Sequence, residues 1–159
     1  MAKFLTLNTH SWMEEEQETK LNQLVERILQ EKYDVICLQE VNQLTESEQV
    51  VQAPFYQAVE GAIAIHQDHF ALCLVEKLAE AGLDYHWSWA YNHIGFDIYN
   101  EGVAILSRNP MAPREVLVSE ANDPKDYHTR KVLLAETEVE GQLLTIASCH
   151  LSWWDKGFQ

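Results

Sequence analysis

The sequence is poor in cysteine and in long apolar runs, and each shortage excludes a class of protein. Its three cysteines are an odd number, and Cys37 and Cys149 lie in strand-like runs, so we expect reduced structural thiols and a cytoplasmic location. No apolar run approaches the roughly 20 residues that a transmembrane helix needs. Residues 1–8 resemble a strand and not a signal peptide.

Basic residues are also scarce. Lysine and arginine number 11 against 25 aspartates and glutamates, which gives a formal net charge of -14 at pH 7. Such a protein repels phosphate backbones at long range. The balance argues against a non-specific nucleic-acid binder and, more mildly, against a nuclease that holds long duplexes, although a bound cation changes the charge locally. The length of 159 residues and the 47% hydrophobic content indicate one globular domain.

The stretch 33–42 contains the strongest candidate site in the sequence. Its apolar, strand-like run ends in the polar residues Gln39, Glu40 and Asn42. Strand interiors avoid carboxylates, so an acid at the exit of a buried strand either reaches water or binds a ligand. In open α/β sheets the ligand crevice lies outside the carboxyl ends of the strands. Glu40 is therefore a candidate site residue.

A strand, a helix and a second strand are predicted over the first quarter of the chain. The apolar run 3–7 precedes Asn8, and Ser11 has the capping-box spacing to an acid three residues later. Apolar residues at helical spacing then predict a helix over 13–31. A strand-helix-strand unit implies a parallel crossover, which brings both strand ends to one edge of the sheet. Asn8 and Glu40 are therefore expected to be neighbours.

The remaining chain is predicted to hold five strands and one helix. The helix is expected over 69–81, the strands over 85–89, 101–108, 114–118, 132–139 and 143–150, and irregular segments over 43–67 and 92–100. With the two strands above, strands outnumber the helices that are available to cover them. One face of such a sheet stays bare unless a second sheet packs against it.

A hairpin is predicted around Glu140 and Gly141. The hairpin returns the chain, so Arg130 and His150 should finish at the same end of the sheet. A two-residue loop opposes Lys131 to His150, whereas a three-residue loop opposes Arg130 to it. The sequence leaves both alternatives open.

Four stretches, in their order and spacing, together resemble the endonuclease/exonuclease/phosphatase superfamily. They are Leu5-Thr-Leu-Asn-Thr-His10, Asp34-Val-Ile-Cys-Leu-Gln-Glu-Val-Asn42, Glu101-Gly-Val-Ala-Ile-Leu-Ser-Arg108 and Ile146-Ala-Ser-Cys-His-Leu151. The resemblance implies a four-layer α/β/β/α sandwich, of which residues 1–159 supply the N-terminal part, roughly one half. It also implies magnesium-dependent hydrolysis of phosphate esters, in which water attacks phosphorus with the help of the metal. The family's later Gly-Asp-Phe-Asn-like and Ser-Asp-His-like motifs, which normally supply the general base and transition-state contacts, are not in this sequence.

The resemblance assigns roles to two residues at the expected metal site. Glu40 is similar to the family's metal-binding glutamate, for Mg²⁺ or Mn²⁺, and a hard cation that keeps several waters suits one carboxylate plus a substrate phosphate. Asn8 is similar to the asparagine that positions the metal or the phosphate, since an amide offers either oxygen or N–H. The alternatives are a solvated acid at a strand end and a turn asparagine.

The resemblance also covers the groups expected around the phosphate. Tyr99 and Glu101 have a Tyr-x-Glu spacing that resembles the deoxyribonuclease branch, where the acid orients a histidine, here His150. His150 would donate to a phosphate oxygen or to the leaving group. Arg130 would support the site through its charge, and Tyr99 would contact substrate. The alternatives are an exposed loop acid, a strand-entry arginine and loop packing of the tyrosine.

Other residues near predicted strand ends have two interpretations each. The histidines either line the cleft or lie in ordinary loops, and the tryptophans either stack on a base, sugar or choline-like group or pack the ends of the sheets. They are His10, His93, His128, Trp12, Trp153 and Trp154.

Two functions from different classes follow. In the first, the protein is a metal-dependent phosphoesterase whose substrate is a nucleic acid, a phospholipid such as sphingomyelin, or a small phosphate ester. The negative charge favours a substrate that is not a polymer. In the second, the chain is a non-catalytic half that needs the C-terminal half or a second copy of itself to fold and function.

Overall fold

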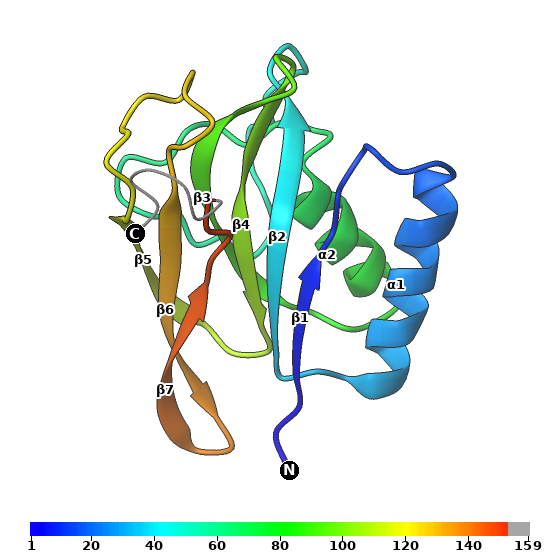
Figure 1. Cartoon of the computed structure of the whole chain (residues 1–159). Helices are drawn as coiled ribbons and strands as arrows, with labels where there is room; N and C mark the ends of the chain where they lie inside the picture. The colour runs from blue at the N-terminus through cyan, green and yellow to red at the C-terminus, as the bar shows by residue number, and fades with distance from the viewer. Residues whose placement is uncertain (153–159) are drawn as a thin grey trace.

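The computed structural model describes residues 1–152, and their alternating and helical apolar patterns form seven strands and two helices in a mixed α/β fold (Figure 1). The elements are β1 (Phe4–Asn8), α1 (Gln17–Glu31), β2 (Val35–Leu44), α2 (Phe70–Glu80), β3 (His86–Gly95), β4 (Tyr99–Ser107), β5 (Met111–Leu117), β6 (Lys131–Val139) and β7 (Gln142–Ser148). The predicted number of strands and helices is confirmed for these residues.

The strands form two sheets. The first has the order β1-β2-β4-β3, with β1 parallel to β2 and the other pairs antiparallel. The second is the antiparallel sheet β5-β6-β7. The parallel β1–β2 pair is the predicted crossover, and α1 connects its two strands.

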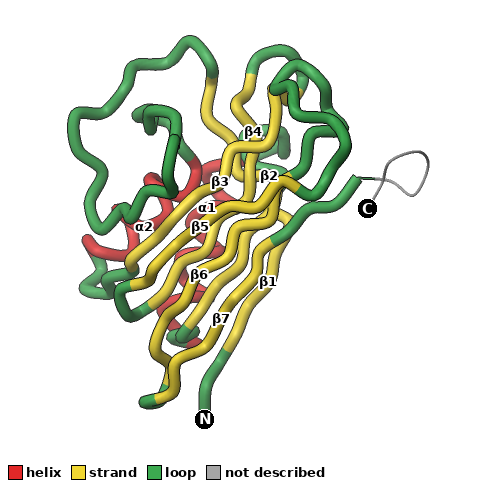
Figure 2. Tube along the Cα trace, turned by 90° about the vertical axis from the view of Figure 1, so that its left-hand side faces the viewer, coloured by secondary structure: helices red, strands yellow, loops and turns green. Residues whose placement is uncertain are grey.

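Both faces of the four-stranded sheet are buried, because successive side chains of a strand point to opposite faces. Ile36 of β2 and Leu106 of β4 belong to the core beneath the two helices. Val35 and Ile105, one residue away in each strand, belong to the core shared with the three-stranded sheet. The layers are therefore helices, first sheet and second sheet (Figure 2). Residues 1–152 place no helix on the outer face of the second sheet, where the four-layer sandwich has its last layer.

The length of the β6–β7 turn decides which of the two predicted registers forms. Val139 pairs with Gln142, so Glu140 and Gly141 form a two-residue loop, and both have positive φ, at 49° and 78°. That conformation is typical of tight hairpins. The register Leu133↔Ser148 continues toward the pairing of Lys131 with His150.

Two local predictions were wrong. The first helix begins at Gln17 and not at residue 13, and Ser11 does not cap it, because its hydroxyl donates to the carbonyl oxygen of Glu40. The segment 92–100 is not a loop, since β3 reaches Gly95 and β4 begins at Tyr99. The short turn between them was missed because its residues lack the usual Asn-Gly signal.

No helix within residues 1–152 has the length and apolar character needed to cross a membrane. Trp153 and Trp154 lie outside the described residues.

Candidate active site

A β-bulge in β2 presents Glu40. Leu38 pairs with Ala104 and Val41 with Gly102, so two residues of β2, Gln39 and Glu40, lie opposite a single residue of β4. Glu40 has a φ of 52°, in the left-handed region that few residues other than glycine adopt. Bulges of this kind redirect a side chain and are common near active sites.

The segment after β1 holds the bulge in place. The carbonyl oxygen of Glu40 accepts hydrogen bonds from Thr9 Oγ1 at 2.9 Å and Ser11 Oγ at 2.6 Å. The backbone N–H of Asn42 donates to Ser11 Oγ at 2.9 Å, and its side-chain amide donates to the Ser11 carbonyl at 2.9 Å. Because Ser11 is fully buried, these bonds fix the backbone on both sides of Glu40.

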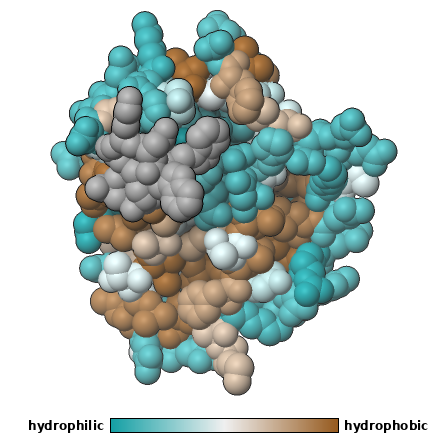
Figure 3. All heavy atoms as spheres, in the orientation of Figure 1, coloured by the Kyte–Doolittle hydropathy of each residue, from teal (hydrophilic) through white to brown (hydrophobic). Residues whose placement is uncertain are grey.

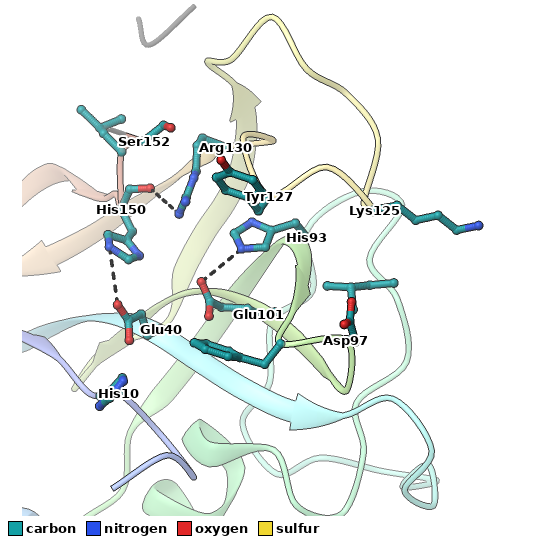
Figure 4. A pocket seen from close by; sticks show the side chains of 14 residues that line it. His10, Glu40, His93, Asp97, Glu101, Lys125, Tyr127, Arg130, His150 and Ser152 are labelled. Atoms are coloured by element: carbon teal, nitrogen blue, oxygen red, sulfur yellow. Dashed lines mark hydrogen bonds and ion pairs between the residues drawn. The ribbon is translucent and has the colours of Figure 1, made fainter. Parts of the chain in front are cut away.

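The predicted meeting of Asn8 and Glu40 is confirmed by direct contact. Asn8 Nδ2 donates to Glu40 Oε1 at 2.8 Å, while Asn8 Oδ1 accepts from the backbone N–H of His10 at 3.1 Å. His150 approaches from the second sheet, with its Nε2 3.7 Å from the same carboxylate oxygen (Figure 4). Glu40, at the bulge of β2, therefore links a residue at the end of β1 to one that follows β7.

A second bulge, in β3, positions His93. Tyr91 pairs with Gly102 and His93 with Glu101, which leaves Asn92 as the extra residue. The side-chain oxygen of Asn92 accepts a hydrogen bond from the backbone N–H of Lys131 at 2.9 Å and so connects this bulge to the second sheet.

His93 and Glu101 form a buried ion pair. His93 Nε2 lies 3.3 Å from Glu101 Oε1, and their side chains are 4% and 8% exposed. His93 Nδ1 lies 3.2 Å from the carbonyl oxygen of Thr129, so both ring nitrogens face an oxygen atom. Burial opposes ionisation of Glu101, but the hydrogen bond and charge of His93, aided by His150 and Arg130, hold its pKa below the ordinary value.

This geometry changes the predicted role of Glu101. The acid was expected to orient His150, but the histidine that pairs with it is His93. The charge of Glu101 still acts on His150, because it opposes the lowering of that residue's pKa.

Arg130 and His150 lie together, as the hairpin predicted. Arg130 Nη1 donates to the carbonyl oxygen of His150 at 3.3 Å. Burial lowers the pKa of His150, the charge of Arg130 lowers it further, and Glu40 and Glu101 oppose both effects. Arg130 Nε and His150 Nδ1 are buried and have no hydrogen-bond partner within residues 1–152. Buried polar atoms normally have partners, so a site that offers two such atoms is suited to an anionic ligand.

These groups surround a cavity of about 450 Å³ (Figure 4). It is lined by His10, Glu40, His93, Ile94, Gly95, Phe96, Asp97, Glu101, Lys125, Tyr127, Arg130, His150, Leu151 and Ser152. Asn8 does not line it but contacts Glu40 beside it. Tyr99 does not line it either, and its hydroxyl donates to the carbonyl oxygen of Trp12 at 3.4 Å. Its contact with substrate stays a prediction.

The remaining histidines separate clearly. His10 and His93 line the cavity, whereas His128 pairs with Asp126 at 2.7 Å and is not among the lining residues. The hydrogen bond that the His10 ring donates to Glu14 raises the pKa of His10, and the nearby Glu40 acts in the same direction. The role of His93 was missed because it depends on the bulge at Asn92, which the sequence does not reveal.

The chemistry of the Glu40 site suits a hard cation held by few protein ligands. Glu40 offers a carboxylate, which is a ligand that magnesium accepts, and Asn8 holds that carboxylate through its amide N–H while its amide oxygen accepts from the backbone N–H of His10. Within the described residues, no three His, Cys, Asp or Glu side chains are grouped closely enough to hold a metal by themselves. Magnesium usually keeps several waters and shares substrate phosphates, so one carboxylate held by an amide fits it as part of a site.

Comparisons with known proteins show which family the chain resembles. The model of the endonuclease/exonuclease/phosphatase family matches residues 12–156. A structure of an endonuclease/exonuclease/phosphatase family protein from Leptotrichia buccalis C-1013-b is similar over 96% of this chain, with 33% identity and a TM-score of 0.83. The search of curated proteins found no match.

Two more distant solved structures share the fold. One is an endonuclease/exonuclease/phosphatase from Beutenbergia cavernae DSM 12333, with 17% identity over 96% of this chain and a TM-score of 0.60. The other is the human Nocturnin catalytic domain with bound sulfate anion, with 18% identity over 92% of this chain and a TM-score of 0.56. The chain spans 54%, 38% and 48% of the length of the Leptotrichia, Beutenbergia and Nocturnin chains.

Proposed function

The chain belongs to the endonuclease/exonuclease/phosphatase family, and from this premise we propose that it is a magnesium-dependent hydrolase of phosphate ester bonds. Members of the family are generally hydrolytic phosphoesterases that use divalent metal ions. The observation that carries the proposal is the contact of Asn8 with Glu40 at 2.8 Å, beside a cavity that also holds Arg130 and His150. The arrangement joins a carboxylate suited to a cation with groups suited to a phosphate.

Glu40 would hold the metal, and Asn8 would keep its carboxylate in place through the amide N–H. Mg²⁺ or Mn²⁺ bound there would neutralise charge that develops on the phosphoryl oxygens. The hydrogen bonds that Thr9 and Ser11 donate to the Glu40 carbonyl fix the bulge, so the carboxylate is positioned before any ligand arrives.

Arg130 and His150 would act on the phosphate. Arg130 supplies a fixed positive charge, and its buried Nε is available for a phosphate oxygen. His150 would donate to a phosphate oxygen or to the leaving group. Burial and the charge of Arg130 lower its pKa, which favours the neutral ring in the free protein, and the negative charge of a bound phosphate would favour the protonated ring that donates. The His93–Glu101 pair lines the same cavity and would hold its wall in position.

The substrate that we favour is a small phosphate ester. The net charge of -14 opposes the approach of a long nucleic acid, even with Arg130 and Lys125 at the cavity. A DNA-binding titration against salt tests this preference. Weak binding with a shallow salt dependence is expected, and tight binding that falls steeply with salt would contradict it.

Hydrolysis of bis-p-nitrophenyl phosphate tests the proposed activity. With magnesium present, Glu40→Gln should lower turnover by about 100-fold or more, since the metal accounts for several kcal/mol of transition-state stabilisation. Glu136→Gln is the matched control, because it removes the same charge from an exposed position on β6. Equal turnover in the two variants would reject the assignment.

A second candidate function rests on one surface. Strand β1 ends the first sheet and β7 ends the second, and an apolar band crosses this face of the molecule (Figures 1 and 3). Exposed Phe4 and Leu143 belong to these two strands. Such edge strands are suited to pairing with further strands, so the chain would be one half of a larger assembly.

Sedimentation of the 159-residue chain separates the two candidates. A monomer with metal-dependent turnover supports the enzyme and contradicts the half-assembly. A dimer or aggregate without turnover supports the half-assembly.

The cytoplasmic location stays a prediction. Cys37, Cys73 and Cys149 are free thiols in the structure.

A further inference from the structure

An exposed aromatic side chain stands at the mouth of the cavity on a strained turn. Phe96 lines the cavity and is 64% exposed, at the tip of the β3–β4 hairpin. It and Asp97 have positive φ values of 51° and 62°. A bulky residue in this conformation is strained, and exposure of a phenyl ring to water is a further cost. Strain of this kind gathers at ligand-binding positions, and a glycine would have removed both costs.

A second aromatic side chain reaches the same cavity from a different segment. Tyr127 is 56% exposed and lines the cavity together with Lys125. Its loop is ordered by hydrogen bonds: Thr129 Oγ1 donates to the Asp123 carbonyl at 2.7 Å, and the Asp123 N–H donates back to Thr129 Oγ1 at 3.1 Å.

The two turns are joined to each other and to the buried ion pair. The N–H of Ile94 donates to the Pro124 carbonyl at 2.7 Å, which ties the tyrosine loop to the strand that carries Phe96. The Thr129 carbonyl oxygen lies 3.2 Å from His93 Nδ1. Both rings therefore project from segments whose positions are fixed before a ligand binds, which reduces the ordering cost of stacking.

The cavity is larger than a phosphate, and it has a charged part and an aromatic part. Glu40, Arg130 and His150 supply its charged part, whereas Phe96 and Tyr127 supply two aromatic surfaces. We propose that Phe96 and Tyr127 form a stacking subsite for a flat ring on the group esterified to the phosphate. This proposal rests on the proposed phosphoesterase function. The substrate class is then a nucleotide-like or aryl phosphate ester of low molecular mass. Charged Asp97 and Lys125 at the same mouth suit such a ring better than a long alkyl chain.

The test compares two phosphates that differ by one flat ring. Calorimetric titration with adenosine 5′-monophosphate and with ribose 5-phosphate, both with magnesium, measures the ring's contribution without any turnover. Phe96→Ala should weaken binding of the nucleotide about tenfold and leave ribose 5-phosphate within about twofold, since one stacked base contributes that much. Tyr127→Ala should act in the same direction.

The chain offers a close control. Phe55 is also an exposed phenylalanine, 42% exposed, with a positive φ of 57°, and it does not line the cavity. Phe55→Ala should leave both affinities unchanged, which separates a subsite effect from the relief of backbone strain.

Three results would overturn the subsite. They are an unchanged ratio of the two affinities in Phe96→Ala, an equal loss for both ligands, and no binding of either ligand by the unaltered chain. Loss of binding to phosphatidylcholine vesicles in Phe96→Ala, with nucleotide affinity intact, would assign the hairpin to a lipid surface instead. Failure of the phosphoesterase itself is read separately, from Glu40→Gln and hydrolysis.

Discussion

The two β-bulges next to Gly102 have similar backbone irregularities but present side chains with different surroundings. The bulge in β2 presents Glu40, whose side chain is 19% exposed and faces the amide of Asn8 and the ring of His150. The bulge in β3 presents His93, which is paired with Glu101 in a buried ion pair. Both irregularities lie against one central strand, β4.

The difference between them is the number of partners left for a ligand. His93 has an oxygen atom beside each ring nitrogen, and Glu101 has His93 as its partner at 3.3 Å, so this pair is complete within the fold. Within the described residues, the contacts of the Glu40 carboxylate are the neutral amide of Asn8 and the more distant ring of His150. A carboxylate with so little compensating charge is suited to a cation, whereas the complete pair is suited to holding the cavity wall.

Gly102→Ala should disturb both bulges at once. A Cβ at Gly102 would lie 2.2 Å from the carbonyl oxygen of Ala90 and 2.5 Å from Trp89 Nε1. The backbone of β3 or β4 must shift, and both bulges are registered against this residue. We expect a loss of about 3 kcal/mol or more in the free energy of unfolding, measured by urea denaturation. A stable variant with unchanged activity would show that the close packing at Gly102 is dispensable.

Glu101→Gln should destabilise the fold more than Glu40→Gln does. It leaves His93 buried without its counter-charge and should lower the free energy of unfolding by roughly 2–3 kcal/mol. Glu40→Gln should change stability by less than about 0.5 kcal/mol, because the nearest ionisable partner of Glu40 among residues 1–152 is His150, at 3.7 Å. Thermal and urea unfolding of the two variants measure this directly. Equal losses would contradict the distinction drawn between the bulges.

The sequence predicted the first bulge's contacts better than the second's. The meeting of Asn8 and Glu40 followed from the parallel crossover alone, and the position of Arg130 beside His150 followed from the hairpin. The bulges themselves depend on cross-strand register, which no local pattern encodes, so the partner of Glu101 was not predictable.

Other local signals failed because tertiary contacts compete with them. The Ser11 hydroxyl has a capping-box spacing, but it is buried against the Glu40 carbonyl and cannot serve the helix. The turn at Phe96 and Asp97 forms without glycine or asparagine at those two positions, so the segment resembled a loop.

Ser11→Ala should weaken the first bulge alone. It removes the donor to the Glu40 carbonyl and the acceptor of the Asn42 N–H, both in a buried setting. A loss of about 2 kcal/mol in the free energy of unfolding is expected, with a fall in turnover. Activity should fall while the His93–Glu101 pair, followed by the imidazole resonances of His93 in NMR, stays unchanged. Disturbance of both would mean that the bulges are not independent.

The smallest expected effect is on acid stability and belongs to the second bulge. The pKa of Glu101 in the folded protein lies below its ordinary value of 4.5. Its ionised form therefore stabilises the fold fully above that ordinary value, and the contribution is lost as pH falls through the lower folded pKa. The difference in unfolding free energy between the unaltered chain and Glu101→Gln should shrink as pH falls from 7 toward 3. A difference independent of pH would contradict this origin.

Direct titration of the metal tests the central claim that Glu40, supported by Asn8, grips a divalent cation. Calorimetry with Mg²⁺, or paramagnetic relaxation with Mn²⁺, should show one site in the unaltered chain and in Glu136→Gln. In Glu40→Gln the affinity should fall by about tenfold or more, because the carboxylate is the one charged ligand that the described residues offer at that position. Equal affinity in all three proteins would contradict the claim.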